Sequence, residues 1–211
     1  MSIYFLLLLI MTLLLYKCII SSLAYAPKKI KIISFLALIL MSFRYIALII
    51  LLIIQNQGYL YLLKPMVFTN LLCIPICGMI SVFIFARNNK IKLKKILVIS
   101  VMLCTVYLIV IYKSPASVNI SKLYGYTIAL KLESYYYIPM IIINSILLIK
   151  GIKLFDETYS NKLGAILIII SSCITLISVL LTSINIEFAW LFLGDLSWII
   201  TMDYALIRFK K

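Results

Sequence analysis

Histidine is absent from this chain of 211 residues, and only six residues are acidic. The absence of histidine removes the commonest general base and the commonest metal ligand of proteins. No HExxH, GxSxG or P-loop motif is present, and the CIPIC pair Cys73 and Cys77 has no histidine nearby to complete a zinc site. The sequence therefore predicts no catalytic residue, no metal and no cofactor, and it predicts buried free cysteines.

Charge is also scarce, since 12% of the residues are charged whereas 65% are hydrophobic. The mean hydropathy is +1.20. Apolar runs recur along the whole chain, at the length of ~20 residues that a helix needs to cross the ~30 Å hydrocarbon core of a bilayer. Backbone groups in lipid must satisfy one another, which favours helices. We therefore predict an all-α, polytopic membrane protein embedded in a lipid bilayer.

Seven apolar segments are long enough to span the membrane, and together they predict a seven-transmembrane-helix bundle that forms one domain over residues 1–211. The predicted spans are residues 3–24, 32–56, 61–86, 95–113, 135–155, 163–184 and 187–207. The first span ends in Ala24-Tyr25-Ala26, which resembles a signal-peptidase site. It carries no charge before Lys17, so we expect it to stay uncleaved as an anchor.

Basic residues give the chain a net charge of +14 and predict its orientation. With the N-terminus outside, the inner connections hold fourteen lysines and arginines and the outer connections hold four. The inner residues are Lys28, Lys29, Lys31, Arg87, Lys90, Lys92, Lys94, Lys95, Lys150, Lys153, Lys162, Arg208, Lys210 and Lys211, and the outer ones are Lys64, Lys113, Lys122 and Lys131. We therefore predict an outer N-terminus and a cytoplasmic C-terminus. No basic helix face with stacking aromatics is present, which argues against nucleic acid as a partner.

Four charged side chains lie inside the predicted spans: Lys17, Arg44, Asp195 and Asp203. Residue counts at ~1.5 Å each place Arg44 ~16 Å and Asp195 ~12 Å below the outer surface. The same rule places Lys17 at ~21 Å and Asp203 at ~24 Å. Because intramembrane charges usually face the bundle interior and pair, we predict the ion pairs Arg44–Asp195 and Lys17–Asp203. These pairs require the last helix to contact the first two, as closure of a ring of helices would allow.

Each polar feature of the spans has a structural and a functional interpretation. The ion pairs either fix helix packing or form a coupling-ion, proton or ligand site. A hydroxyl stripe in segment 163–184 either packs against a neighbouring helix or lines a polar cavity. Its members recur on one helical face, and they are Ser171, Thr175, Ser178 and Thr182.

Segment 61–86 carries Pro65, Asn70 and Pro75 and is expected to kink. Such kinks are either simply tolerated or build a substrate cavity that Asn70 helps to line. The longest connection, residues 114–134, is expected either to cap the outer face or to form a solvated linker.

Two stretches resemble the seven-helix N-terminal membrane domain of bacterial sensor histidine kinases. IPICGMISVFIFARNN (74–89) resembles its third helix and the following inner loop, and DYALIRFKK (203–211) resembles its last helix. The resemblance implies a role in signal transduction. In that family an output module follows the seventh helix, whereas this sequence ends at Lys211, so we expect a separate cytoplasmic or membrane signalling partner.

These observations predict a non-enzymatic, receptor-like or interaction module of a bacterial signalling system in the cytoplasmic membrane. The alternative is a small-solute or ion transporter whose path is lined by Arg44, Asp195 and the kinked third helix. A membrane-embedded enzyme is the third alternative, which the missing catalytic groups disfavour.

Overall fold

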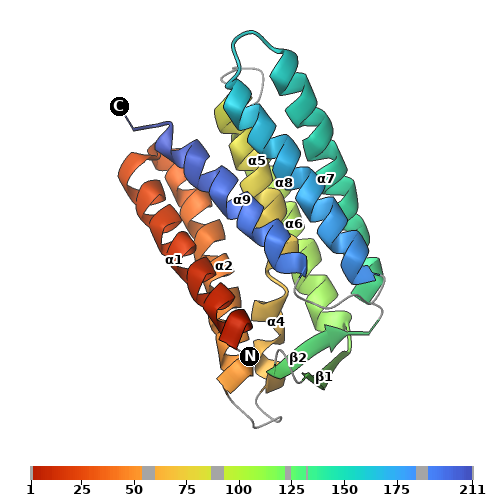
Figure 1. Ribbon diagram of the computed structural model, residues 1–211. Helices are drawn as coiled ribbons and strands as arrows, with labels where there is room; N and C mark the ends of the chain where they lie inside the picture. Colours follow the sequence, from red (N-terminus) through yellow and green to blue (C-terminus); the bar gives the residue numbers. More distant parts are fainter. Residues whose placement is uncertain are drawn as a thin grey trace.

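The computed structural model describes residues 2–53, 60–86, 93–121, 125–131, 133–183 and 190–210. Within these ranges, seven long helices run side by side, with the start of the first and the end of the last at opposite ends of the bundle (Figure 1). The helices are α1 (Ser2–Tyr25), α2 (Lys28–Ile53), α5 (Asn70–Ala86), α6 (Leu93–Lys113), α7 (Glu133–Asp156), α8 (Lys162–Ser183) and α9 (Trp190–Ile207). The chain is therefore predominantly helical, as its apolar runs predict.

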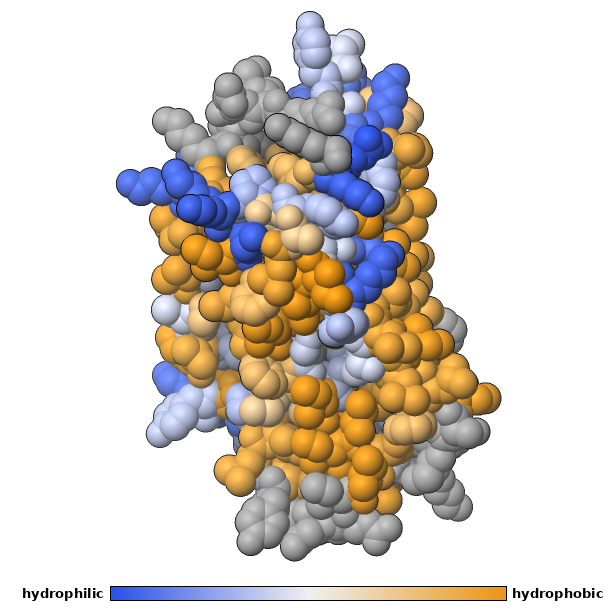
Figure 2. All heavy atoms as spheres, turned by 90° about the vertical axis from the view of Figure 1, so that its left-hand side faces the viewer, coloured by the Kyte–Doolittle hydropathy of each residue, from blue (hydrophilic) through white to orange (hydrophobic). Residues whose placement is uncertain are grey.

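Six helical stretches of the described residues are long and apolar enough to cross a membrane. They are Ile3–Tyr25, Lys28–Ile53, Tyr61–Ala86, Leu93–Lys113, Tyr135–Asp156 and Lys162–Ser183. Figure 2 shows a broad apolar surface on the α1 side of the bundle, as a lipid-facing surface would require. These features indicate a multi-pass membrane protein. Helix α9, with 18 residues and two acids, is not among the six.

Several residues used in the sequence predictions lie outside the described ranges. Among the basic residues these are Arg87, Lys90, Lys92, Lys122 and Lys211. The ends of three predicted spans, at residues 54–56, 184 and 187–189, also lie outside them.

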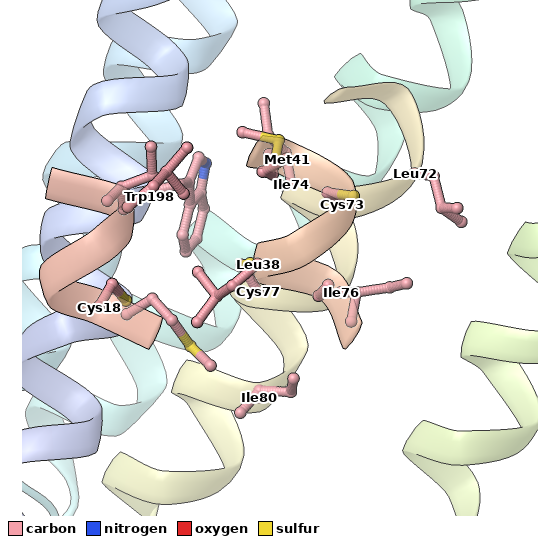
Figure 3. Packing of buried hydrophobic residues seen from close by; sticks show 14 of the residues in the cluster. Cys18, Leu38, Met41, Leu72, Cys73, Ile74, Ile76, Cys77, Ile80 and Trp198 are labelled. Carbon is pink, nitrogen blue, oxygen red and sulfur yellow. The ribbon is translucent and has the colours of Figure 1, made fainter. Parts of the chain in front are cut away.

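Helix α5 occupies the centre of the bundle. It packs against α2, α6, α7, α8 and α9, and most of its residues are buried. Its sequence is apolar around the whole circumference, so every face can be buried. Figure 3 shows this core, in which Cys18 of α1, Leu38 of α2, Cys77 of α5 and Trp198 of α9 belong to one buried cluster. The helices therefore surround α5 instead of closing a simple ring.

The third predicted span is broken before α5. A 3-10 turn, η1 (Tyr61–Leu63), leads into the short helix α4 (Lys64–Val67), and the chain turns at Phe68 and Thr69. The single O–H of Thr69 lies within donating distance of the carbonyls of Met66, at 2.9 Å, and of Leu40 on α2, at 3.3 Å. Pro75 lies inside α5, which continues past it. The interruption therefore precedes Asn70, and Thr69 satisfies a carbonyl that the break frees.

The connection after α6 folds into a hairpin. Strands β1 (Ala116–Ser121) and β2 (Gly125–Leu130) pair antiparallel, with Ala116 opposite Leu130 and Ser121 opposite Gly125. Gly125 has φ +73°, and a Cβ there would lie 3.2 Å from the Cα of Leu52 on α2. Ile128 and Leu130 are buried. The segment is therefore a folded cap against the end of α2, and the all-α prediction missed its two strands.

Candidate functional site

The centre of the site is an ion pair between α2 and α9. Arg44 Nη2 lies 3.3 Å from Asp195 Oδ2, and the two side chains are 1% and 0% exposed. Tyr45 donates its hydroxyl to the same carboxylate oxygen at 2.9 Å. Arg44 and Tyr45 belong to the buried face of α2, which recurs at spacings of three and four residues with Met41 and Leu48. The structure thus brings together the two residues that the sequence predicts to pair.

An aromatic wall covers the guanidinium. The Cζ of Arg44 lies 5.9 Å from the centroid of the Phe192 ring, close enough for a cation–π contact. The rings of Tyr4 on α1 and Tyr45 on α2 lie 5.7 Å and 6.1 Å from that of Phe192. Sequence reasoning missed all three aromatic residues. Phe192 could have been found, because it precedes Asp195 by three positions and so lies on the same face of α9.

The pair leaves hydrogen-bonding capacity unused. Arg44 Nε, Arg44 Nη1 and Asp195 Oδ1 are buried and have no hydrogen-bond partner among the described protein groups. A buried polar atom without a partner costs roughly 1–3 kcal/mol, and a charged group costs more. The chemistry of these atoms matches a polar group that accepts from the guanidinium and donates to the carboxylate.

The second ion pair has a different setting. Lys17 Nζ lies 2.8 Å from Asp203 Oδ2, with side chains 62% and 12% exposed. Ser21 on α1 donates its hydroxyl to Asp203 Oδ1 at 2.8 Å. Both carboxylate oxygens are therefore occupied, and the pair fastens α1 to α9 at the edge of the bundle.

Two members of the hydroxyl stripe of α8, Ser171 and Thr175, lie beside α9. Ser171 donates to the Ser197 carbonyl at 3.0 Å, and its oxygen lies 2.6 Å from Thr201 Oγ1. Thr175, Ser178 and Thr182 donate to carbonyls one turn earlier in their own helix. The bonds of Ser171 to α9 agree with the packing interpretation for that residue, whereas the bonds of the other three stay within α8. Asn70 is buried at the first residue of α5.

The five cysteines carry no disulfide, and all but Cys173 lie in or against the apolar core. Cys18, Cys73 and Cys77 are buried, and Cys104 and Cys173 are half-buried. Within the described part of the chain, no group of His, Cys, Asp and Glu residues is placed to hold a metal ion.

Comparison of the chain with known protein families and with characterised proteins found no match. The resemblance to sensor-kinase membrane domains therefore stays a prediction from the sequence pattern. The geometry of the Arg44–Asp195 pair carries the functional argument instead.

Proposed function

We propose that this chain is a non-enzymatic, receptor-like membrane module that binds a small polar solute at the Arg44–Asp195 site. The observation that carries the proposal is the unused hydrogen-bonding capacity on both buried charges. The unpartnered guanidinium N–H groups favour a ligand with a carboxylate or carbonyl oxygen, because arginine is a donor only. The unpartnered carboxylate oxygen favours a donor on the same ligand, such as an ammonium or hydroxyl group.

The proposed topology has seven crossings, with α9 as the last, an outer N-terminus and a cytoplasmic C-terminus in a bacterial cell membrane. Two observations support α9 as a span. It packs along α1, α5 and α8 for its length, and each of its acids contacts a base. Pairing offsets part of the cost of placing a carboxylate in the membrane. The basic residues Lys28, Lys29, Arg208 and Lys210 support an inner position for this end of the bundle, because cytoplasmic connections are enriched in lysine and arginine.

A ligand at this site would change the position of α9 relative to α2. Arg44 and Tyr45 hold Asp195 from α2, so a solute inserted between these groups would replace the direct contact. The ligand shifts the bundle only if it binds one arrangement of α2 and α9 more tightly than the other. The residues that follow α9, Arg208 and Lys210, would transmit that change to a separate signalling partner.

Binding is tested by thermal unfolding of the purified protein in detergent, with amino acids, carboxylates, amines and sugars as solutes. We expect a solute that carries both an acceptor and a donor to stabilise the fold, by roughly 2.7 kcal/mol at a hundred times its Kd. Arg44→Gln should abolish that effect, whereas Arg208→Gln, a change at an exposed arginine, should preserve it. Equal responses of the wild type and Arg44→Gln would contradict the proposed site.

Transport is the second candidate, and the break before α5 favours it. The break contacts α2 at the carbonyl of Leu40, one turn from Arg44. Interrupted helices form the solute sites of many transporters. The test is flux in liposomes that contain a pH-sensitive dye, with solutes and ion gradients varied. Solute-dependent flux that Asp195→Asn abolishes would favour transport over a receptor without transport.

A further inference from the structure

An open groove lies between α1 and α9, beside the Lys17–Asp203 pair. Its volume is about 370 Å³, and its lining includes Tyr16, Lys17, Ile20, Tyr25, Ile207 and Lys210. Figure 2 views the α1 side of the bundle, where hydrophilic side chains gather mainly in the upper half, toward the C-terminal end, above an apolar surface. We propose that this groove binds the headgroup and upper acyl chain of an anionic phospholipid. The proposal does not depend on the solute site at Arg44.

Lys17 has an unusual position for a charged side chain. Its side chain is 62% exposed on the face of α1 that points away from the bundle, where Leu13, Tyr16 and Ile20 are also exposed. The ammonium group of Lys17 forms an ion pair with Asp203, and the Lys17 side chain also lines the groove. A charge at this depth is costly beside hydrocarbon. A phosphate oxygen or the glycerol oxygens of a lipid would complete its coordination.

Lys210 supplies a second positive charge at the rim. Its Nζ lies 5.8 Å from the centroid of the Tyr25 ring, and Tyr25 is two turns, or ~12 Å, along α1 from Lys17. The neighbouring Arg208 is engaged by Tyr204, which accepts hydrogen bonds from its Nε and Nη2 at 3.1 Å and 2.5 Å. Of these two basic residues, Lys210 is therefore the one that lines the groove, whereas Arg208 does not.

The chemistry of the groove selects an anionic phospholipid over other ligands. Two lysines face it against the single carboxylate of Asp203, whose oxygens already contact Lys17 and Ser21. The net positive charge favours an anionic headgroup over a zwitterionic one. Tyrosines are typical of the headgroup level, and the side chains of Ile20 and Ile207 offer apolar contact to an acyl chain. Inorganic phosphate would lack that apolar contact.

The test uses the full-length protein in detergent, titrated with short-chain phosphatidylglycerol, short-chain phosphatidylcholine or inorganic phosphate. Thermal unfolding is the readout. We expect phosphatidylglycerol alone to raise the unfolding temperature. Lys210→Ala should weaken its apparent affinity about fivefold, the scale of one lysine at an anionic membrane surface.

Lys113→Ala, at an exposed lysine on the far end of α6, is the matched control and should leave the affinity unchanged. The double variant Lys17→Met with Asp203→Asn removes the deeper charges together and should also weaken binding. Equal stabilisation by phosphatidylglycerol and phosphatidylcholine would overturn the proposal. So would equal stabilisation by phosphatidylglycerol and inorganic phosphate, or equal affinities of the Lys210→Ala and Lys113→Ala variants.

Discussion

At the residue scale, the two acids of α9 are held in different ways. Asp195 is fully buried and receives Arg44 and Tyr45 on a single oxygen, so its other oxygen has no partner among the described groups. Asp203 uses both oxygens, for Lys17 and Ser21. Loss of one member of the buried Arg44–Asp195 pair should therefore cost more than loss of one member of the Lys17–Asp203 pair, because a buried charge without its partner is strongly destabilising.

Neutralising Asp195 alone should be severe. We expect Asp195→Asn to lower the free energy of unfolding by roughly 3–5 kcal/mol, because Arg44 is left buried without its counter-ion. The double variant Arg44→Met with Asp195→Asn should lose less than the sum of the two single variants. Tyr45→Phe, which removes only a hydrogen bond, should cost about 1 kcal/mol. Denaturant unfolding in mild detergent measures all four variants, and strict additivity of the single changes would show that the pair does not interact.

The partners of both acids could be predicted from the sequence because the rise of a helix is constant. Counting residues from the span ends gives depth, and depth matched Arg44 to Asp195 and Lys17 to Asp203. Depth says nothing about rotation around the helix axis. Tyr45, Tyr4 and Phe192 were therefore missed, as was Asn144 on α7, whose side-chain oxygen accepts a hydrogen bond from Trp198 Nε1 at 3.2 Å.

At the element scale, α8 approaches α5 closely where Gly164 meets Phe85. A Cβ at Gly164 would lie 2.4 Å from Cγ of the buried Phe85 ring. The same ring contacts that of Tyr204 on α9, with centroids 5.8 Å apart. Gly164 therefore lets three helices pack around one aromatic ring.

Gly164→Ala tests this close approach. The added methyl group should overpack the contact and cost about 1–3 kcal/mol. Gly194→Ala is the milder comparison, since a Cβ there would meet its nearest atom, Thr175 Oγ1, at 3.3 Å, which a shift of a few tenths of an ångström relieves. Thermal unfolding compares the two, and Phe85→Leu should recover part of the Gly164→Ala loss. If Gly164→Ala is as stable as Gly194→Ala, α8 does not pack against Phe85 in this way.

The helices could be predicted because membrane length and apolar composition are strong signals, whereas the break and the hairpin were harder. The prolines of segment 61–86 predict a kink there. The chain instead turns at Phe68 and Thr69, where the Thr69 hydroxyl can satisfy a freed carbonyl. The hairpin does carry an alternating signal in Tyr126, Ile128 and Leu130. The preceding strand β1 also alternates, with Ala116, Val118 and Ile120 between Ser117, Asn119 and Ser121. Each run has only six residues, so the signal was weaker than the surrounding apolar runs of about 20 residues.

At the scale of the whole molecule, the central position of α5 could not be predicted from the sequence. A helix that is apolar on all sides gives no preferred face, so its pattern does not distinguish a central place from a lipid-facing one. The order of the helices around α5 depends on side-chain fit, as at Gly164, and on the polar contacts of α9. For the direction of the chain across the membrane, by contrast, the basic residues that flank the spans do give a prediction.

The central claim is that α9 is a seventh span whose acids are tolerated because they are paired, which places the C-terminus in the cytoplasm. Reporter fusions in a bacterial host test it most directly, with immunoblots to normalise expression. Green fluorescent protein fused to the C-terminus should fluoresce, alkaline phosphatase fused there should be inactive, and phosphatase inserted between β1 and β2 should be active. An active phosphatase and a dark fluorescent protein at the C-terminus would show that α9 does not cross the membrane and would contradict the account.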